Sequence, residues 1–243
     1  MKKQYRKVLL TLEDLGYGAA EGSMILDFGC GDGSGVAGLR ERGYEAYGCD
    51  LKFREEDDIS SLAGSGHVRL IETAPYRLPF DDGLFDIVYS CQVFEHVQNY
   101  RETLREIHRV MKPGGVSLHI FPSRYRPIES HFHVPLASIN MNYQYLHFWA
   151  RLGVRQDRQK GMSAEEVARY NFTALNERTN YLSKKEIVSF VGEFFAGCRF
   201  CELLASRHSR LAPVYPVFSR IPFASQLLST FQTRVLFFSK SPA

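Results

Sequence analysis

The sequence predicts an α/β fold, a doubly wound and mostly parallel sheet with helices on both faces. Two observations support this prediction. The apolar run Met24–Phe28 leads directly into a glycine-rich turn over 29–33, which is typical of a buried parallel strand that turns into a helix. Strand and helix patterns then alternate as far as residue 121, which indicates βαβ crossovers. The alternation stops there, and we expect a helical and loop insert after the fifth strand.

Local patterns define the individual elements. Apolar residues at helical spacing predict a leading helix over 5–15, which Gly16 ends. The polar, glycine-rich segment 53–66 is expected to form at most a short helix. The other elements expected in this half are strands at 24–28, 44–49, 68–71, 84–89 and 116–121, and helices at 35–42 and 100–111.

The helix over 100–111 has the clearest pattern of the chain, with apolar residues on one face. Asn99 and Glu102 have the spacing of a capping box at its start. The run Pro113–Gly115 is expected to end it. The charged residues of its other face are expected to contact water: Arg101, Glu102, Arg105, Glu106 and Arg109.

The composition changes after Pro122, where aromatic residues and histidines become frequent. Capping boxes predict two further helices, one with Ser163 and Glu166 and one with Ser183 and Glu186. The second helix is expected to bury Ile187, Val188, Val191, Phe194 and Phe195. Closing strands are predicted at 198–204 and 233–238, with a long connection over 211–229.

We therefore expect one domain over residues 1–243. Its expected parts are an N-terminal helix within 1–20, a core at 24–121, an insert at 123–180, and a closing helix and strands at 181–243.

The composition is that of an ordinary globular protein, with 44% hydrophobic and 23% charged residues. No apolar run reaches the ~18–20 residues that cross a bilayer, and the N-terminus lacks the apolar part of a signal peptide. The five cysteines are an odd number, and Cys30 lies in the glycine turn, so a cytoplasmic location is expected. The net charge of +3 allows an anionic substrate without requiring nucleic acid.

The glycine turn is a candidate ligand site, because exposed backbone N–H groups before a helix bind anions or carboxylates. A dinucleotide site would have a third glycine at position 34, where this chain has Ser34. Asp27 and Asp32 would also repel a pyrophosphate, whereas a zwitterion with an amino group and a sulfonium tolerates them. Asp50 ends the second strand, where a carboxylate can accept both ribose hydroxyls of a nucleoside.

These residues carry a family resemblance. The blocks Ile25–Gly33, Gly48–Asp50, Leu78–Val88, Ser90–Val97 and Glu106–Gly115 resemble the class I S-adenosylmethionine-dependent methyltransferases. The match covers 24–121, with weaker similarity at 181–204 and 233–240. The resemblance implies a Rossmann-like fold with a seven-stranded sheet and a reversed final strand. It also implies S-adenosyl-L-methionine as cofactor and S-adenosyl-L-homocysteine as product.

The resemblance also implies a set of cofactor-binding residues. Asp27, Gly29, Cys30 and Gly31 would surround the methionine end, Asp50 would bind the ribose, and Leu51 would lie against the adenine. Ser90 and Gln92 would line the opening between cofactor and acceptor. Many relatives have an acid four residues before the Leu-Pro-Phe block, where this chain has Ala74. Glu72 or Thr73 is therefore the candidate for holding the adenine.

The acceptor side has three candidate catalytic residues, His96, His131 and His133. His96 is either a base or a structural histidine. Glu129, His131 and His133 alternate, so in an extended stretch they would point to one side. They could then supply a base for a hydroxyl acceptor, bind a metal, or form a polar loop edge. We assign no metal ligands from the sequence.

The predicted function is methyl transfer to a small molecule, with a hydroxyl group as the expected acceptor. The segment Ser90–Val93 lacks the Asn/Asp-Pro-Pro-aromatic signature of enzymes that methylate amino groups of DNA bases. One alternative is a tRNA-modifying methyltransferase, which the basic residues Arg151, Arg155, Arg158 and Lys160 would favour. Another is a cofactor-binding partner subunit without catalysis. Cys198 and Cys201 are expected to be core residues rather than metal ligands. The oligomeric state does not follow from the sequence.

Overall fold

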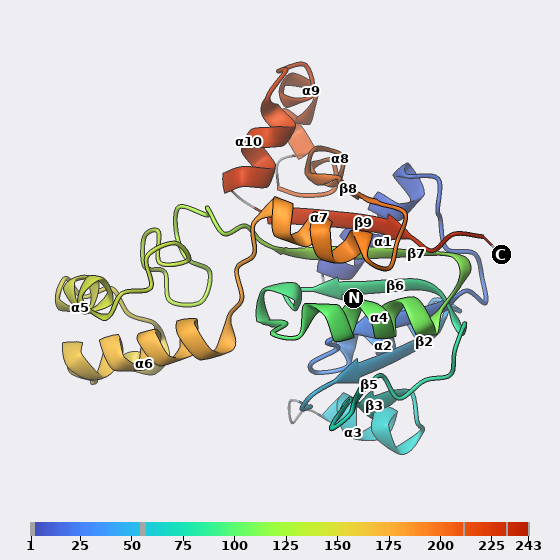
Figure 1. Cartoon of the computed structure of the whole chain (residues 1–243), viewed down its shortest axis with the longest axis horizontal. Coiled ribbons are helices and arrows are strands. Elements are labelled where there is room, and N and C mark those ends of the chain that lie inside the picture. The colour runs from blue at the N-terminus through green and yellow to red at the C-terminus, as the bar shows by residue number, and fades with distance from the viewer. Residues whose placement is uncertain (1–2, 54–56, 211, 232, 243) are drawn as a thin grey trace.

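A seven-stranded sheet organises the computed structural model, which describes residues 3–53, 57–210, 212–231 and 233–242 (Figure 1). The strand order is β3-β2-β1-β6-β7-β9-β8. β9 is antiparallel to β7 and β8, and the other pairs are parallel. The strands are β1 (Met24–Phe28), β2 (Glu45–Asp50), β3 (Val68–Leu70), β6 (Phe85–Cys91), β7 (Met111–Pro122), β8 (Cys198–Phe200) and β9 (Thr233–Ser239). The predicted doubly wound sheet with a reversed final strand is confirmed.

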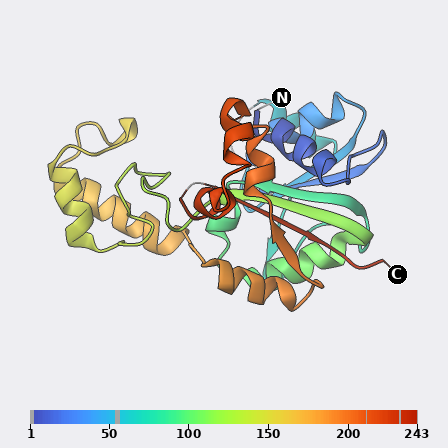
Figure 2. The ribbon, with the colours of Figure 1, turned by 90° about the horizontal axis from the view of Figure 1, so that it is seen from above.

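Helices cover both faces of this sheet, as the view from above shows (Figure 2). On one face α1, α2, α3 and α8 pack on apolar side chains such as Ile25 and Ile87, and on the other α4 and α7 pack on Leu26 and Val88. Alternate residues of one strand thus enter opposite cores, because successive side chains of a strand point to opposite faces. These helices are α1 (Lys3–Asp14), α2 (Ser34–Arg40), α3 (Asp57–Gly64), α4 (Tyr100–Val110), α7 (Lys184–Gly192) and α8 (Glu202–Ser206).

The chain between β7 and α7 forms a lobe that projects beyond one end of the sheet (Figure 1). It contains α5 (Tyr143–Arg151), the short helix η2 (Asp157–Gln159) and α6 (Ala164–Arg178). The lobe has a small apolar core of its own, which includes Phe132, Leu146 and Leu175. Tyr145 and Trp149 pack against this core, so these two aromatic side chains hold the lobe together.

Two of the three predicted capping boxes are present. Ser163 caps α6 and Ser183 caps α7, in each case with the reciprocal glutamate contact. The box at α4 was predicted wrongly, since the side chain of Asn99 accepts no capping hydrogen bond from the helix. It instead accepts a bond from the Thr103 hydroxyl, at 3.3 Å.

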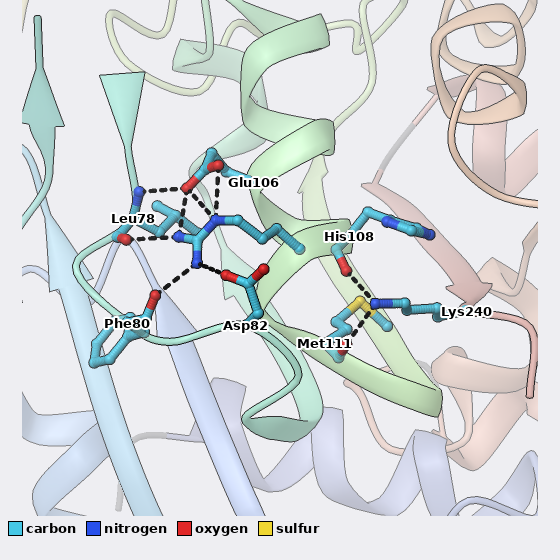
Figure 3. Close-up of polar contacts among 8 residues, drawn as sticks. Leu78, Phe80, Asp82, Glu106, His108, Met111 and Lys240 are labelled. Atoms are coloured by element: carbon cyan, nitrogen blue, oxygen red, sulfur yellow. Dashed lines mark hydrogen bonds and ion pairs between the residues drawn. The ribbon is translucent and has the colours of Figure 1, made fainter. Parts of the chain in front are cut away.

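The prediction that Glu106 and Arg109 contact water is also wrong, since their side chains are only 11% and 15% exposed. Figure 3 shows the polar contacts around Glu106. Glu106 is buried and accepts from Leu78 N at 2.8 Å and from Arg109 Nη2 at 2.6 Å. The Arg109 guanidinium also donates to the carbonyls of Leu78 and Phe80 and to Asp82. This network fixes the segment before β6 to α4. The helical pattern alone does not reveal it, because the partners come from a loop about thirty residues earlier.

Three predicted element boundaries and one predicted buried residue also need correction. Met111 is already extended after α4, so Pro113–Gly115 lies within β7 instead of ending the helix. Val188 is exposed. Residues 202–206 form α8, not a strand. The connection 211–229 contains helices, namely η3 (Ala212–Val214), α9 (Tyr215–Phe218) and the start of α10 (Ala224–Phe231).

A two-stranded sheet of β4 (Glu72–Thr73) and β5 (Tyr76–Arg77) lies between β3 and β6 in the chain, and the short helix η1 (Phe94–His96) follows β6. Some predictions include residues that lie outside the described ones, namely 1–2, 54–56, 211, 232 and 243. The predictions concerned are those for 1–20, 53–66, 211–229 and 181–243.

Candidate active site

The glycine turn lies at the carboxyl end of β1, beside the point where the strand order changes direction. β1 has β2 on one side and β6 on the other, which is where open α/β sheets bind ligands. Gly29 has φ +79°, and a Cβ there would overlap the side chain of Val93. Gly33 has φ +73°, and its Cβ would lie 2.9 Å from Ile59 and Leu62. The turn therefore requires glycine for both its backbone angles and its close contacts.

Asp50, at the end of β2, is oriented by backbone amides. Its Oδ2 accepts from Gly31 N at 2.9 Å, and its Oδ1 accepts from Leu51 N at 2.7 Å. Lys52 N also donates to Oδ1, at 3.4 Å. A carboxylate has about four acceptor positions, so Oδ2 keeps capacity for one further donor. The two loops that follow β1 and β2 are thereby joined through one side chain.

A cavity of about 620 Å³ opens above this turn. Seven of the sequence-predicted site residues line it: Gly29, Cys30, Gly31, Asp50, Leu51, Gln92 and His96. The wall includes the apolar side chains of Ile71 and Tyr76, which come from either side of the exposed pair Glu72 and Thr73. The cavity thus combines the glycine turn and the acids Asp32 and Asp50 on one side with an apolar wall on the other.

Four predicted cofactor residues do not line the cavity. Asp27 is 2% exposed and lies below the turn, next to Gly35 and the Tyr5 ring. Ser90 is fully buried, and its hydroxyl is 2.8 Å from His119 Nδ1. Glu72 and Thr73 are exposed on β4.

Sequence reasoning missed several residues that line the cavity, among them Tyr5, Cys91 and Thr103. Cys91 lies between two predicted positions, so the pattern could have included it. Tyr5 and Thr103 come from helices α1 and α4, and only the packing of those helices brings them to the turn.

Two histidines from distant segments meet at the edge of the cavity. His96 follows β6 and lines the cavity, and its Nε2 is 3.2 Å from Nε2 of His131, which comes from the lobe. Each ring is fixed through its other nitrogen. His96 Nδ1 donates to the Arg178 carbonyl at 2.6 Å, and His131 Nδ1 donates to Glu129 Oε1 at 2.6 Å.

Glu129 is buried behind the histidine pair, with 1% of its surface exposed, and orients the His131 ring. Its Oε2 accepts from the backbone N–H groups of His131 and Phe132, and its Oε1 accepts from the Tyr181 hydroxyl. Burial alone would raise the pKa of Glu129, but the hydrogen bond and charge of His131 outweigh it and lower the pKa. For His131 burial acts to lower the pKa, and Glu129 reverses this and raises it.

Glu95 is a further acid beside the two histidines, and the sequence did not single it out. It is 1% exposed, its Oε1 is 4.0 Å from His96 Nε2, and neither carboxylate oxygen accepts a hydrogen bond from another described residue. Burial raises the pKa of this carboxyl to about 7. An acid with so little solvation is unusual outside functional sites.

The expectation that residues 129, 131 and 133 point to one side of an extended stretch is wrong. The segment turns, since His133 N donates to the Glu129 carbonyl at 3.1 Å and His133 has φ +59°. His133 is exposed, away from the pair. It lines a second cavity of about 600 Å³ together with His131, Arg155 and Arg158.

A family model described as a methyltransferase domain matches residues 26–118. Sterol 4-C-methyltransferase strm-1 of Caenorhabditis elegans is 26% identical over 100 residues, which are 40% of this chain and 30% of that protein. Malonyl-[acyl-carrier protein] O-methyltransferase of Salmonella typhimurium is 32% identical over 92 residues, or 38% and 36% of the two chains. The chain spans less than half the length of the curated relatives it matches.

Among solved structures, the fold is similar to that of a Haemonchus contortus phosphoethanolamine N-methyltransferase in complex with S-adenosylhomocysteine. The TM-score is 0.54 at 15% identity, covering 98% of this chain and 52% of that one.

The sheet order thus defines a Rossmann-like fold, which the chain shares with this solved methyltransferase. More specifically, residues 26–118 match the model of a methyltransferase domain, in agreement with the sequence resemblance to class I S-adenosylmethionine-dependent methyltransferases. The proteins that it matches include methyltransferases whose names specify carbon, oxygen or nitrogen acceptors. No helix in the described part of the chain is long and apolar enough to span a membrane.

Proposed function

We propose that this domain transfers a methyl group from S-adenosylmethionine to a small molecule, and that the acceptor atom is a hydroxyl oxygen. The observation that supports the hydroxyl is the His96–His131 pair at the edge of the cavity, backed by Glu129. A hydroxyl must lose its proton during transfer, and these are groups that can accept or stabilise it.

The cavity fits the cofactor in size and in the chemistry of its wall. Asp50 lines the cavity and would accept from the ribose, since its Oδ2 keeps an open acceptor position. Leu51, Ile71 and Tyr76 would cover the adenine, which makes an acid at position 74 unnecessary. The turn at Gly29–Gly31 would contact the methionine part, because these residues line the cavity next to Asp50. We propose no direct contact between the cofactor and the four residues outside the cavity wall, Asp27, Ser90, Glu72 and Thr73.

The cofactor supplies an activated methyl group on a sulfonium. The chain's own task is to hold the acceptor in line with it, which can provide much of the rate. The acceptor would lie on the lobe side of His131, where Arg155 and Arg158 contribute to the second cavity. That cavity is lined by polar and charged side chains, Asp157 among them, which suits a polar acceptor.

The test is a methyl-donor consumption assay with four acceptor classes, namely sugars, phenols, carboxylates and bulk tRNA. We expect formation of S-adenosylhomocysteine with a hydroxyl compound, abolished by His131→Asn with cofactor affinity retained. Turnover only with amines or carbon acceptors would contradict the hydroxyl assignment. Binding of S-adenosylhomocysteine without turnover on any acceptor would favour a partner subunit without catalysis.

The contacts of the basic residues in the lobe weaken the argument for a tRNA substrate. Arg155 donates to the carbonyls of Met162 and Ala150. Arg158 lies over the rings of Phe132 and Tyr170, and Lys160 pairs with Asp157. Arg155 therefore has a role within the lobe, and Asp157 interrupts the run of exposed basic side chains formed by Arg151, Arg158 and Lys160. A steep salt dependence of RNA binding would restore that alternative.

A further inference from the structure

We propose that Glu95, His96 and His131 bind a divalent transition-metal ion at the edge of the cofactor cavity. The three side chains come from η1 and from the lobe, and their ligand atoms all lie within 4.8 Å of one another. Two imidazoles and one carboxylate are a ligand set that suits first-row divalent ions. The binding of the ion is independent of the proposed function, and only its role toward the acceptor rests on that function.

The orientation of the two rings supports a cation between them. Both Nδ1 atoms carry a proton, because each donates to an oxygen that can only accept, the Arg178 carbonyl and the ionised Glu129. In the neutral rings both Nε2 atoms then present a lone pair, and these face one another across 3.2 Å. Two lone pairs at this distance repel unless a positive charge lies between them, which a shared proton or a metal ion supplies. Two nitrogens at ~2.0–2.1 Å from a tetrahedral ion are about 3.3 Å apart, which matches the observed spacing.

Glu95 provides the third ligand, and its burial gives the strongest support for a bound cation. It is a buried acid whose oxygens receive no hydrogen bond from another described residue, and its Oε1 lies 4.0 Å from His96 Nε2. A movement of about 0.7 Å would bring that oxygen to ligand spacing around the same ion. A buried carboxylate without hydrogen-bond partners is costly, and a metal ion compensates for that cost.

The surrounding groups resemble the outer shell of a metal site. Metal-bound histidines donate their other N–H to a carboxylate or a carbonyl, which fixes the ring and its tautomer. His131 does so to Glu129, and His96 does so to the backbone of Arg178. Tyr181 in turn holds Glu129 at 2.7 Å. This set differs from the alternating group 129, 131 and 133 of the sequence, since His133 is excluded and Glu129 serves as the outer partner.

Three protein ligands leave a coordination position open, as in catalytic metal sites. Because His96 lines the cofactor cavity and His131 the second cavity, this position is accessible to an acceptor. A hydroxyl bound there would release its proton to solvent more readily and so become a better nucleophile. The cation would thus replace a histidine base in the proposed reaction.

The test uses the full, tag-free chain after treatment with a chelator, without cofactor or acceptor. Zn²⁺ is titrated by calorimetry, and Co²⁺ is followed by its visible absorption. We expect one ion per chain. His131→Asn should weaken binding by about 100-fold or more, and Glu129→Gln by about 10–100-fold. The matched control is His133→Asn, two residues away, where asparagine suits the φ of +59° and binding should stay within about twofold.

Glu95→Gln separates a ligand from a structural residue. It should weaken ion binding by at least about tenfold, while the melting temperature of the metal-free protein stays constant or rises, because a buried charge has been removed. Absence of ion binding by the wild-type chain would overturn the proposal, as would unchanged binding in both His131→Asn and Glu95→Gln. Since neither measurement involves methyl transfer, failure of the proposed function would appear separately, as absence of turnover by a chain that binds the ion.

Discussion

The two halves of the candidate site are built in different ways. On the cofactor side, the turn after β1 contacts the last residue of β2. The two residues in contact, Gly31 and Asp50, are only 19 residues apart in the chain, and the bond involves a backbone N–H group. On the acceptor side, side chains from remote segments make the contacts. His96 and His131 are 35 residues apart, and His96 and Arg178 are 82 apart. A site made from adjacent loops can be recognised in the sequence, whereas one made by packing a lobe onto a sheet cannot.

The difference should extend to stability, with the core depending on buried charge networks and the lobe on its small apolar core. The largest expected effect is Arg109→Met, which leaves Glu106 buried without its cation. We expect the free energy of unfolding to fall by about 3–5 kcal/mol in urea titrations. The matched control is Arg101→Met, because Arg101 pairs with Glu193 at 2.6 Å but is 53% exposed. Its loss should be far smaller, because an exposed ion pair contributes little, and equal losses in the two variants would contradict the buried network.

The lobe should be separable from cofactor binding. Leu146→Ala removes a fully buried side chain from the lobe core, which should destabilise the lobe by about 3 kcal/mol. We expect faster hydrogen exchange in α5 and α6 and faster proteolysis of the lobe, with the affinity for S-adenosylhomocysteine unchanged. A parallel loss of that affinity would mean that the lobe also shapes the cofactor cavity.

The cofactor side should depend strongly on one carboxylate. Asp50→Ala should weaken S-adenosylhomocysteine binding by about 100-fold, which is about 2.7 kcal/mol, since bonds to a charged acceptor are each worth about 1.5–3 kcal/mol. Calorimetry would measure the change. Asp81→Ala, which removes an exposed acid outside the cavity, is the control. Unchanged affinity in Asp50→Ala would rule out the ribose assignment.

The smallest effect concerns a core histidine that contrasts with those of the lobe. His119 is fully buried between the hydroxyls of Ser90 and Ser117, and burial lowers its pKa to about 3. Below pH ~6.5 the unfolded chain therefore binds a proton that the folded chain excludes. The free energy of unfolding should therefore fall as the pH is lowered from ~6.5 to about 3, by up to about 1.4 kcal/mol per pH unit.

His119→Asn should remove this contribution. Urea titrations at pH 7.0 and 5.5 should show a loss on acidification that is about 1 kcal/mol smaller in the variant than in the wild type. The same pH dependence in both proteins would mean that His119 titrates normally.

The sequence by itself determined the strand–helix order, the turn at Gly29–Gly33, the position of Asp50 and two capping boxes. These features rest on residues that are near one another in the chain, where periodicity, glycine conformation and capping chemistry act locally. Only the tertiary structure decided the burial of Glu106 and the meeting of Glu95, His96 and His131. Those contacts depend on how α4 and the lobe pack against the sheet, and long-range packing leaves no periodic trace in the sequence. The alternation at 129–133 misled for the same reason, because a turn held by Glu129 replaced the extended strand that the pattern assumed.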